Sequence, residues 1–392
     1  MLKLLFSLLL CAQISAAIWK SERPWQEADM LNFREWVKSE LNRDIFSNPD
    51  SPYFGIKTDC ADAIFAYMAI YSLENQLYYQ VKLSHDTIID SDSPRFDHLE
   101  QRERLKALIH FIGSNAGTYA LAYYNSYPVG LKDIQAGDIY ITEWIKNGQA
   151  NRHAYLIKDF LPTGHFILYS STTPVKVRTL AKREGMPLHL FSAAPWGYKR
   201  IAPYYLIKTA QDKSNQQYDL LKKWGKNFHN NLSKLLATED DNYDLNLNRR
   251  LGNICDMMKT RIEEVNSSLV YQQRINRCMN ATEYYMYSTP SRDSSLQSAM
   301  TRLLVGWKNI RKQDISIDPS TYSALEYFYG KDKSSDAKKE LYAKCPVSVM
   351  DSPITMRDFF MLKRANRISS NPNDSLASRW GLSSSTSSCP RY

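Results

Sequence analysis

The sequence predicts an α+β protein in which a cysteine-bearing helix packs on an antiparallel sheet, followed by an all-helical C-terminal domain. Three observations predict this class. Apolar residues at helical spacing dominate up to about residue 112, short β-forming segments separated by turns follow up to about residue 207, and helical spacing alone returns after residue 213. The 392 residues are a length typical of two domains, and the 43% of hydrophobic residues is ordinary for globular proteins.

The N-terminus predicts export. Lys3 is a short positive region, residues 4–10 are apolar, and small residues precede a cleavage site after Ala17, so residues 1–17 read as a signal peptide. This segment is too short to span a bilayer, and no later apolar run is long enough to do so. We therefore expect a mature chain without a transmembrane segment that is periplasmic or secreted.

The mature chain divides into three predicted regions: a first domain over 18–208, a helical domain over 213–365 and a Ser-rich tail over 366–392. In the first domain, helices are expected over 25–42, from residue 60 onward and over 99–112. An antiparallel meander is expected from about 131 to 183, and residues 195–208 would close the sheet. In the second domain, helices are expected over 221–235, over 247–269 and from Pro290, which suits a first helical turn. The tail is expected to be mobile unless Cys389 holds it.

Cysteine usage separates one thiol from the rest. The mature chain keeps Cys60, Cys255, Cys278, Cys345 and Cys389, and an odd number in an exported chain leaves at least one thiol unpaired. The four C-terminal cysteines suffice for two disulfides, and we hypothesise that Cys255 and Cys278 staple neighbouring segments. Cys60 is then the free thiol, either reactive or buried in the core as free cysteines often are.

The formal net charge of +9 favours anionic partners, although it serves solubility equally well. No basic-aromatic motif of a nucleic-acid module occurs, so we predict no nucleic-acid partner. Exposed basic and aromatic residues of the helical domain would suit an anionic polymer or a protein partner, and a plain helical bundle explains them equally well.

Cys60 follows Asp59, and either Asp59 or Thr58 can cap the helix that begins there, so the thiol would face the positive end of the helix dipole. Such a position favours the nucleophilic thiolate, which also needs a base and an orienting group. His153 and His165 each open a predicted strand. If these strands pair directly, their starts lie at opposite ends, so spacing alone does not bring the two histidines together. No HExxH, CxxC or histidine cluster occurs, and we predict no metal and no cofactor.

Four stretches, "TDCADAIFAY", "QAGDIYI", "RHAYLIKD" and "GHFILYSS", together resemble the NlpC-type papain-like cysteine peptidases of bacterial cell walls, over roughly residues 50–175. The resemblance implies a papain-like fold in which Cys60 is the nucleophile, His153 the base and His165 the orienting group. It also implies that Asp59 helps to hold the amino end of the substrate, a peptide in peptidoglycan. From its place in the loop before Cys60, Tyr53 is a candidate donor to the oxyanion, or only a packing residue.

Several departures from the family pattern keep other functions open. Ala61 and Asp62 follow the cysteine where the family has Ser-Gly, Ala136 stands where it has proline, and an insertion covers roughly 84–130. The expected function is an exported cysteine hydrolase that cleaves amide bonds in peptidoglycan peptides through a Cys-His-His triad. The alternatives are a catalytically inactive papain-like binding module and a transglutaminase-like acyl transferase, which the same cysteine and histidine motifs also resemble.

Overall fold

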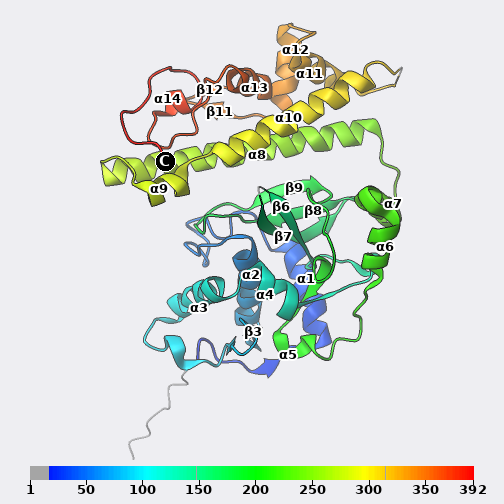
Figure 1. Ribbon diagram of the computed structural model, residues 1–392, viewed down its shortest axis with the longest axis vertical. Helices are drawn as coiled ribbons and strands as arrows, with labels where there is room; N and C mark the ends of the chain where they lie inside the picture. Colours follow the sequence, from blue (N-terminus) through cyan, green and yellow to red (C-terminus); the bar gives the residue numbers. More distant parts are fainter. Residues whose placement is uncertain (1–16, 147, 314) are drawn as a thin grey trace, which may run out of the picture.

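The computed structural model describes residues 17–146, 148–313 and 315–392, and Figure 1 shows its two units, an α+β unit and a helical C-terminal region. The predicted signal peptide, apart from Ala17, lies outside the described residues. The sheet has six strands in the order β5-β10-β6-β7-β8-β9, and every neighbouring pair is antiparallel. The strands are β5 (Ser126–Pro128), β6 (Ile139–Lys146), β7 (Gln149–Phe160), β8 (Phe166–Ser170), β9 (Ala181–Gly185) and β10 (Gly197–Ile201). The predicted meander and its closing strand are confirmed.

The helices of the α+β unit centre on α2. They are α1 (Glu27–Ser39), α2 (Cys60–Glu74), α3 (Gln101–Asn115), α4 (Thr118–Tyr124) and the short α5 (Tyr204–Ile207). Every residue of α2 from Cys60 to Ser72 is buried, because α1, α3 and the sheet all pack around it. Short strands complete the unit: β1 (Arg23–Pro24), β2 (Leu77–Tyr78), β3 (Gln80–Lys82) and β4 (Ile88–Asp90).

The segment predicted as one helix over 221–235 forms two helices, α6 (Gln216–Trp224) and α7 (Phe228–Leu236). The break comes at Gly225, which has a φ of +50°, in the left-handed region that glycine tolerates. Phe228 and Leu232 belong to the core of the α+β unit, whereas the core of the helical region begins at Leu247. The boundary between the units therefore lies beyond α7, about 25–30 residues later than position 213.

The helical region is built on α8 (Tyr243–Ile275), which lies between the sheet unit and helices α10 to α14 (Figure 1). The others are α9 (Ala281–Tyr287), α10 (Pro290–Ile310), α11 (Pro319–Tyr329), α12 (Ser335–Lys344), α13 (Met356–Arg364) and α14 (Leu376–Arg379), with a small hairpin of β11 (Ser348–Val349) and β12 (Ser352–Pro353). Pro290 opens α10 as predicted. The core of this region runs from Leu247 to Trp380, so it includes part of the predicted tail.

Two disulfides pin the helical region, but not in the hypothesised pairing. Cys255 bonds Cys345 and Cys278 bonds Cys389, so a bond between Cys255 and Cys278 was the wrong expectation. Cys255 lies within α8, and Cys278 lies 23 positions later, just beyond the C-terminal end of this helix. Each of the two is bonded to a different segment that is distant in the sequence. Two disulfides fit a chain exported to an oxidising compartment.

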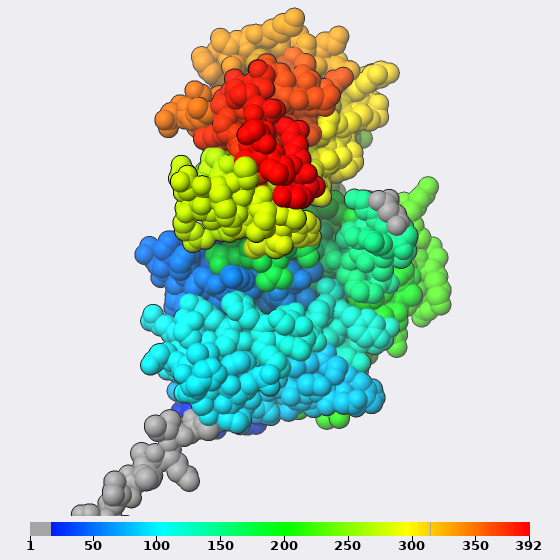
Figure 2. Space-filling model, turned by 60° about the vertical axis from the view of Figure 1, so that its left-hand side comes forward, coloured from blue at the N-terminus to red at the C-terminus, as the bar shows by residue number. Residues whose placement is uncertain are grey.

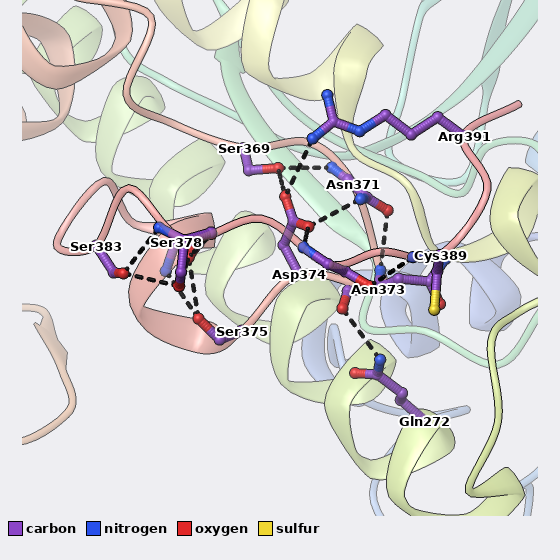
Figure 3. Close-up of polar contacts among 12 residues, drawn as sticks. Gln272, Ser369, Asn371, Asn373, Asp374, Ser375, Ser378, Ser383, Cys389 and Arg391 are labelled. Atoms are coloured by element: carbon purple, nitrogen blue, oxygen red, sulfur yellow. Dashed lines mark hydrogen bonds and ion pairs between the residues drawn. The ribbon is translucent and has the colours of Figure 1, made fainter.

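The Ser-rich tail lies against α8 and is held by the Cys278–Cys389 disulfide, which is the exception to mobility that the sequence left open. Its buried carboxylate, Asp374, accepts hydrogen bonds from Ser369 Oγ at 2.6 Å and from Asn371 Nδ2 at 2.9 Å (Figure 3). Gln272 of α8 donates to the carbonyl of Asn373 at 3.2 Å. In Figure 2 the C-terminal residues, in red, lie on the surface of the helical region. The serines and asparagines thus bond one another and the backbone instead of solvating a free tail.

The two units are joined where α8 crosses the edge strand β9. The Asn253 side chain pairs with the Glu184 backbone in both directions, accepting from its N–H at 2.8 Å and donating to its carbonyl at 2.7 Å. The buried carboxylate of Glu264 on α8 meets Lys176, Arg178 and Arg292. A side-chain amide thus covers an otherwise free sheet edge, and an ion cluster fixes the units relative to each other.

Replacing the central carboxylate of that cluster tests its role. Glu264→Gln should lower the free energy of unfolding at pH 7 by about 3–5 kcal/mol, because three cations lose their buried counter-charge. Burial opposes ionisation, but Arg292, Lys176 and Arg178 hold the pKa of Glu264 below its usual 4.5. The wild-type advantage is therefore present above about pH 4.5 and shrinks as the pH falls further. Urea unfolding at several pH values measures the free energy of unfolding, and Glu239→Gln, at an exposed position, is the control. Equal losses of unfolding free energy in the two variants would contradict the role of the cluster.

The turn between β7 and β8 docks α7 through a glycine. A Cβ at Gly164 would lie 1.9 Å from the Ser233 carbonyl oxygen, whereas one at Gly148 meets nothing within 4 Å, and both residues have positive φ (+69° and +75°). Gly148→Ala should cost about 1 kcal/mol from backbone strain alone. Gly164→Ala should cost at least ~2 kcal/mol more, because the α7 backbone must move. Thermal unfolding of both variants compares them; equal costs would mean that α7 is not held at this turn.

Candidate functional site

The start of α2 is a capping box, and this box surrounds the candidate nucleophile. The Asp59 carboxylate accepts the N–H groups of Ala61 at 3.0 Å and Asp62 at 3.1 Å, and the Asp62 carboxylate accepts the Asp59 N–H at 3.0 Å. Of the two predicted caps, Asp59 and Thr58, the structure uses Asp59. Since the Asp59 carboxylate is occupied by its own helix, its resemblance-based role in holding a substrate amine has no free group to perform it.

The Cys60 thiol is buried and uncharged. It is the free cysteine among the described residues, its side chain lies under α4, and its Sγ is 3.8 Å from the Thr118 hydroxyl. Burial, followed by the Asp59 carboxylate, raises the pKa of Cys60 to about 11, and the backbone N–H of Ala154 and the Thr118 hydroxyl oppose this only in part. The thiolate expected from the helix dipole does not form at neutral pH, because desolvation outweighs the dipole.

His153 lies on the other face of the sheet from the thiol. The thiol contacts Thr118 of α4, and α4 lies on the sheet face of Leu156, because Lys199, in register with Ile139 and Leu156, donates to the Ala122 carbonyl of α4. Successive residues of a strand point to opposite faces, so Ala154 shares that face and His153 does not. The His153 ring packs against Tyr155, with ring centroids 4.4 Å apart. Burial, with a smaller effect of nearby His189, lowers the pKa of His153 to about 4. The structure therefore forms no Cys60–His153 pair.

His165 lies at the far end of β7 from His153. Phe160 pairs with Phe166, whereas His153 pairs with Thr142 on β6, so His165 belongs to the turn that follows β7. Seven residues of strand separate the two ends, which is roughly 20 Å. The His165 ring contacts the Thr163 hydroxyl at 3.0 Å instead. His165 is therefore too far from His153 to orient it, because β7 and β8 pair directly.

Tyr53 is equally remote from the thiol. Its hydroxyl donates to Glu74 Oε1 at 2.5 Å, and Glu74 is the last residue of α2, whereas Cys60 is the first. With a rise of 1.5 Å per residue, the two ends of this helix are about 21 Å apart. Tyr53 therefore packs at the far end of α2 and provides no donor beside Cys60.

Sequence reasoning missed what covers the thiol. The predicted insertion over 84–130 supplies α3, which packs on α2, and α4, whose first residue Thr118 contacts Cys60. The length of the insertion was visible in the sequence, but nothing in "GTYALAYY" marks Thr118 as a lid residue.

A groove between the two units is the other candidate site. Its larger part, about 860 Å³, is lined by Arg183 and His189 from the α+β unit and by Arg250, Arg302 and serines of α10 from the helical region. Its smaller part, about 400 Å³, lies between the segment that follows β8 and the α8 and α10 helices. Four residues line both parts, which makes them one groove: Met257, Pro290, Ser291 and Ser295. Neither Cys60 nor His153 lines it.

Comparisons with protein-family models, with curated proteins and with solved structures found no match for this chain. Among the described residues, no group of histidine, cysteine and carboxylate side chains could hold a metal ion. Across the same residues, no helix has the length and apolar character needed to cross a bilayer.

The Asp59 carboxylate should control the acidity of the thiol. Asp59→Asn keeps a good helix cap and removes the charge that helps to raise the Cys60 pKa. We expect the iodoacetamide rate of the mature chain at pH 8–9 to rise about threefold, equivalent to roughly half a pKa unit. Exposed Asp50→Asn is the control and should leave the rate unchanged. An unchanged rate in Asp59→Asn would mean that the capping carboxylate does not act on the thiol.

Proposed function

We propose that the mature chain is an exported, non-catalytic binding protein: a papain-like module with a closed thiol site, joined rigidly to a helical unit. The observation that carries this proposal is the position of His153, which lies on the opposite face of the sheet from α4 and Cys60. A cysteine hydrolase needs its thiol and its base within hydrogen-bond reach.

The electrostatics of the two groups point the same way. With a thiol pKa of about 11 and an imidazole pKa of about 4, both side chains are neutral at pH 7. A thiolate–imidazolium pair would have to form against desolvation on both sides and against the Asp59 charge. Thr118 and the buried position of the thiol also leave a scissile amide no approach.

The groove supplies the positive part of the proposal. Ligand sites occur preferentially between domains, and the larger part of this groove has a volume typical of such sites. Its walls are fixed by the Glu264 ion cluster and by the pairing of Asn253 with Glu184, so a ligand meets a preformed surface. One wall comes from the helical region, whose basic and aromatic residues suit an anionic or protein partner, although a plain helical bundle explains them equally well.

Cleavage of peptidoglycan peptides and transglutaminase-like acyl transfer both stay predictions from resemblance. Each requires a reactive thiol at Cys60, whereas a binding protein does not. The reactivity of this one thiol therefore separates both enzymes from the binding protein.

The deciding measurement is the pH dependence of Cys60 alkylation by iodoacetamide in the folded mature chain. We expect slow labelling below pH 9, a rate that rises toward pH 11, and the same profile in His153→Ala and His165→Ala. The unfolded chain in urea is the control, and its thiol should label with an ordinary pKa of about 8.5. Fast labelling of the folded chain near pH 6–7, lost in His153→Ala, would establish an activated Cys–His pair and overturn the proposal.

A further inference from the structure

We infer that the groove between the units binds a ligand that carries several phosphate groups. This inference rests on the proposed binding function and names the chemistry of its ligand.

The larger part of the groove gathers positive charge without compensation. Arg183, Arg250 and Arg302 line it from three different elements, β9, α8 and α10, and Lys146 of β6 also lines it. Among the described residues, none of these four makes an ion pair with a carboxylate, and no carboxylate lines this part. Three guanidinium groups that share one hollow repel one another, and an anion between them would relieve that repulsion.

Hydroxyl donors line the same part of the groove as these arginines. Ser291, Ser294, Ser295 and Ser298 follow the helical spacing that places them on one face of α10, and all four line the larger part. Arginine forks and serine hydroxyls are the usual partners of phosphate oxygens, which accept several hydrogen bonds at once.

The smaller part adds positive charge that is only partly neutralised. Arg178 lines it, is 8% exposed and lies 3.5 Å from the Glu264 carboxylate, but its Nε and Nη1 atoms have no hydrogen-bond partner. The one carboxylate in this lining is Asp256, which is paired with Arg43 at 3.1 Å. Because the two parts share Ser291 and Ser295, a ligand with two or more phosphates can reach both.

The lining favours phosphate over a nucleic acid. Apart from His189, the larger part has no aromatic side chain on which a base could stack, and single-stranded nucleic acid is usually held by such stacking. A terminal or monoester phosphate carries up to about two charges and three acceptor oxygens, whereas a carboxylate carries one charge and two oxygens, so a carboxylate polymer would use the converging arginines less fully.

The test is calorimetric titration of the disulfide-intact mature chain at 50 and 200 mM NaCl. The probes are inorganic phosphate, tripolyphosphate, long-chain polyphosphate and polyglutamate. Arg250→Gln combined with Arg302→Gln removes two groove charges, and both residues are exposed and unpaired. Arg274→Gln combined with Arg364→Gln is the matched control, because it removes two exposed charges of the helical region that lie outside the groove.

We expect tripolyphosphate or long-chain polyphosphate to bind more tightly than inorganic phosphate and polyglutamate, and more weakly at the higher salt. The groove variant should weaken this binding at least tenfold and the control variant less than twofold. Comparing the short with the long polyphosphate distinguishes a small phosphorylated ligand from a polymer. The inference is overturned if no polyphosphate binds, if polyglutamate or single phosphate binds as tightly, or if both double variants weaken binding equally. If polyphosphate fails in this way while Cys60 is unreactive, only the ligand class is wrong and the proposed binding function stands. If Cys60 proves reactive, the proposed binding function itself is wrong.

Discussion

The carboxylate of Glu264 is the contact on which the arrangement of the two units depends. Lys176 and Arg178 reach it from the segment after β8, and Arg292 reaches it from α10. Burying one carboxylate among three cations is favourable only while every member keeps its place, since an unpaired charge there is costly. The cluster thus acts as a constraint more than as a source of stability. It fixes α8 across the sheet edge and, with that, the width of the groove beside it.

The sequence predicts most elements where the signal is local and fails where distant segments decide. Alternation and turns define the β6–β9 meander, and Pro290 marks the start of α10, because each depends on neighbouring residues. The docking of α6 and α7 on the first core, and the pairing of Cys278 with Cys389, depend on which surfaces meet in space. From the sequence, the serines of the tail are expected to face solvent. In the structure, the Ser369 hydroxyl and the Ser387 N–H donate to the Asp374 carboxylate.

The candidate triad shows how order along the chain differs from proximity. The motifs around Cys60, His153 and His165 occur in the sequence order of a cell-wall peptidase, yet strand alternation decides which histidine can meet the thiol. A shift of one residue along β7 exchanges the faces of Ala154 and His153. The starts of two directly paired antiparallel strands lie at opposite ends, and the observed register separates His153 from His165 in this way. Burial under Thr118 depends on an insertion whose packing no local pattern encodes.

The groove residues could not be recognised in the sequence, because they come together only in the folded chain. Arg183, Arg250 and Arg302 lie 67 and 52 positions apart in the chain, and each alone reads as an ordinary surface cation. At the Glu264 end of the interface, cations are neutralised by a carboxylate, whereas at the Arg183 end they are not. Folding brings these like charges together without a protein counter-charge, which costs stability in a free chain. The three arginines nevertheless converge on a rigid hollow lined by hydroxyl groups. A bound anion would offset their repulsion and best accounts for this arrangement.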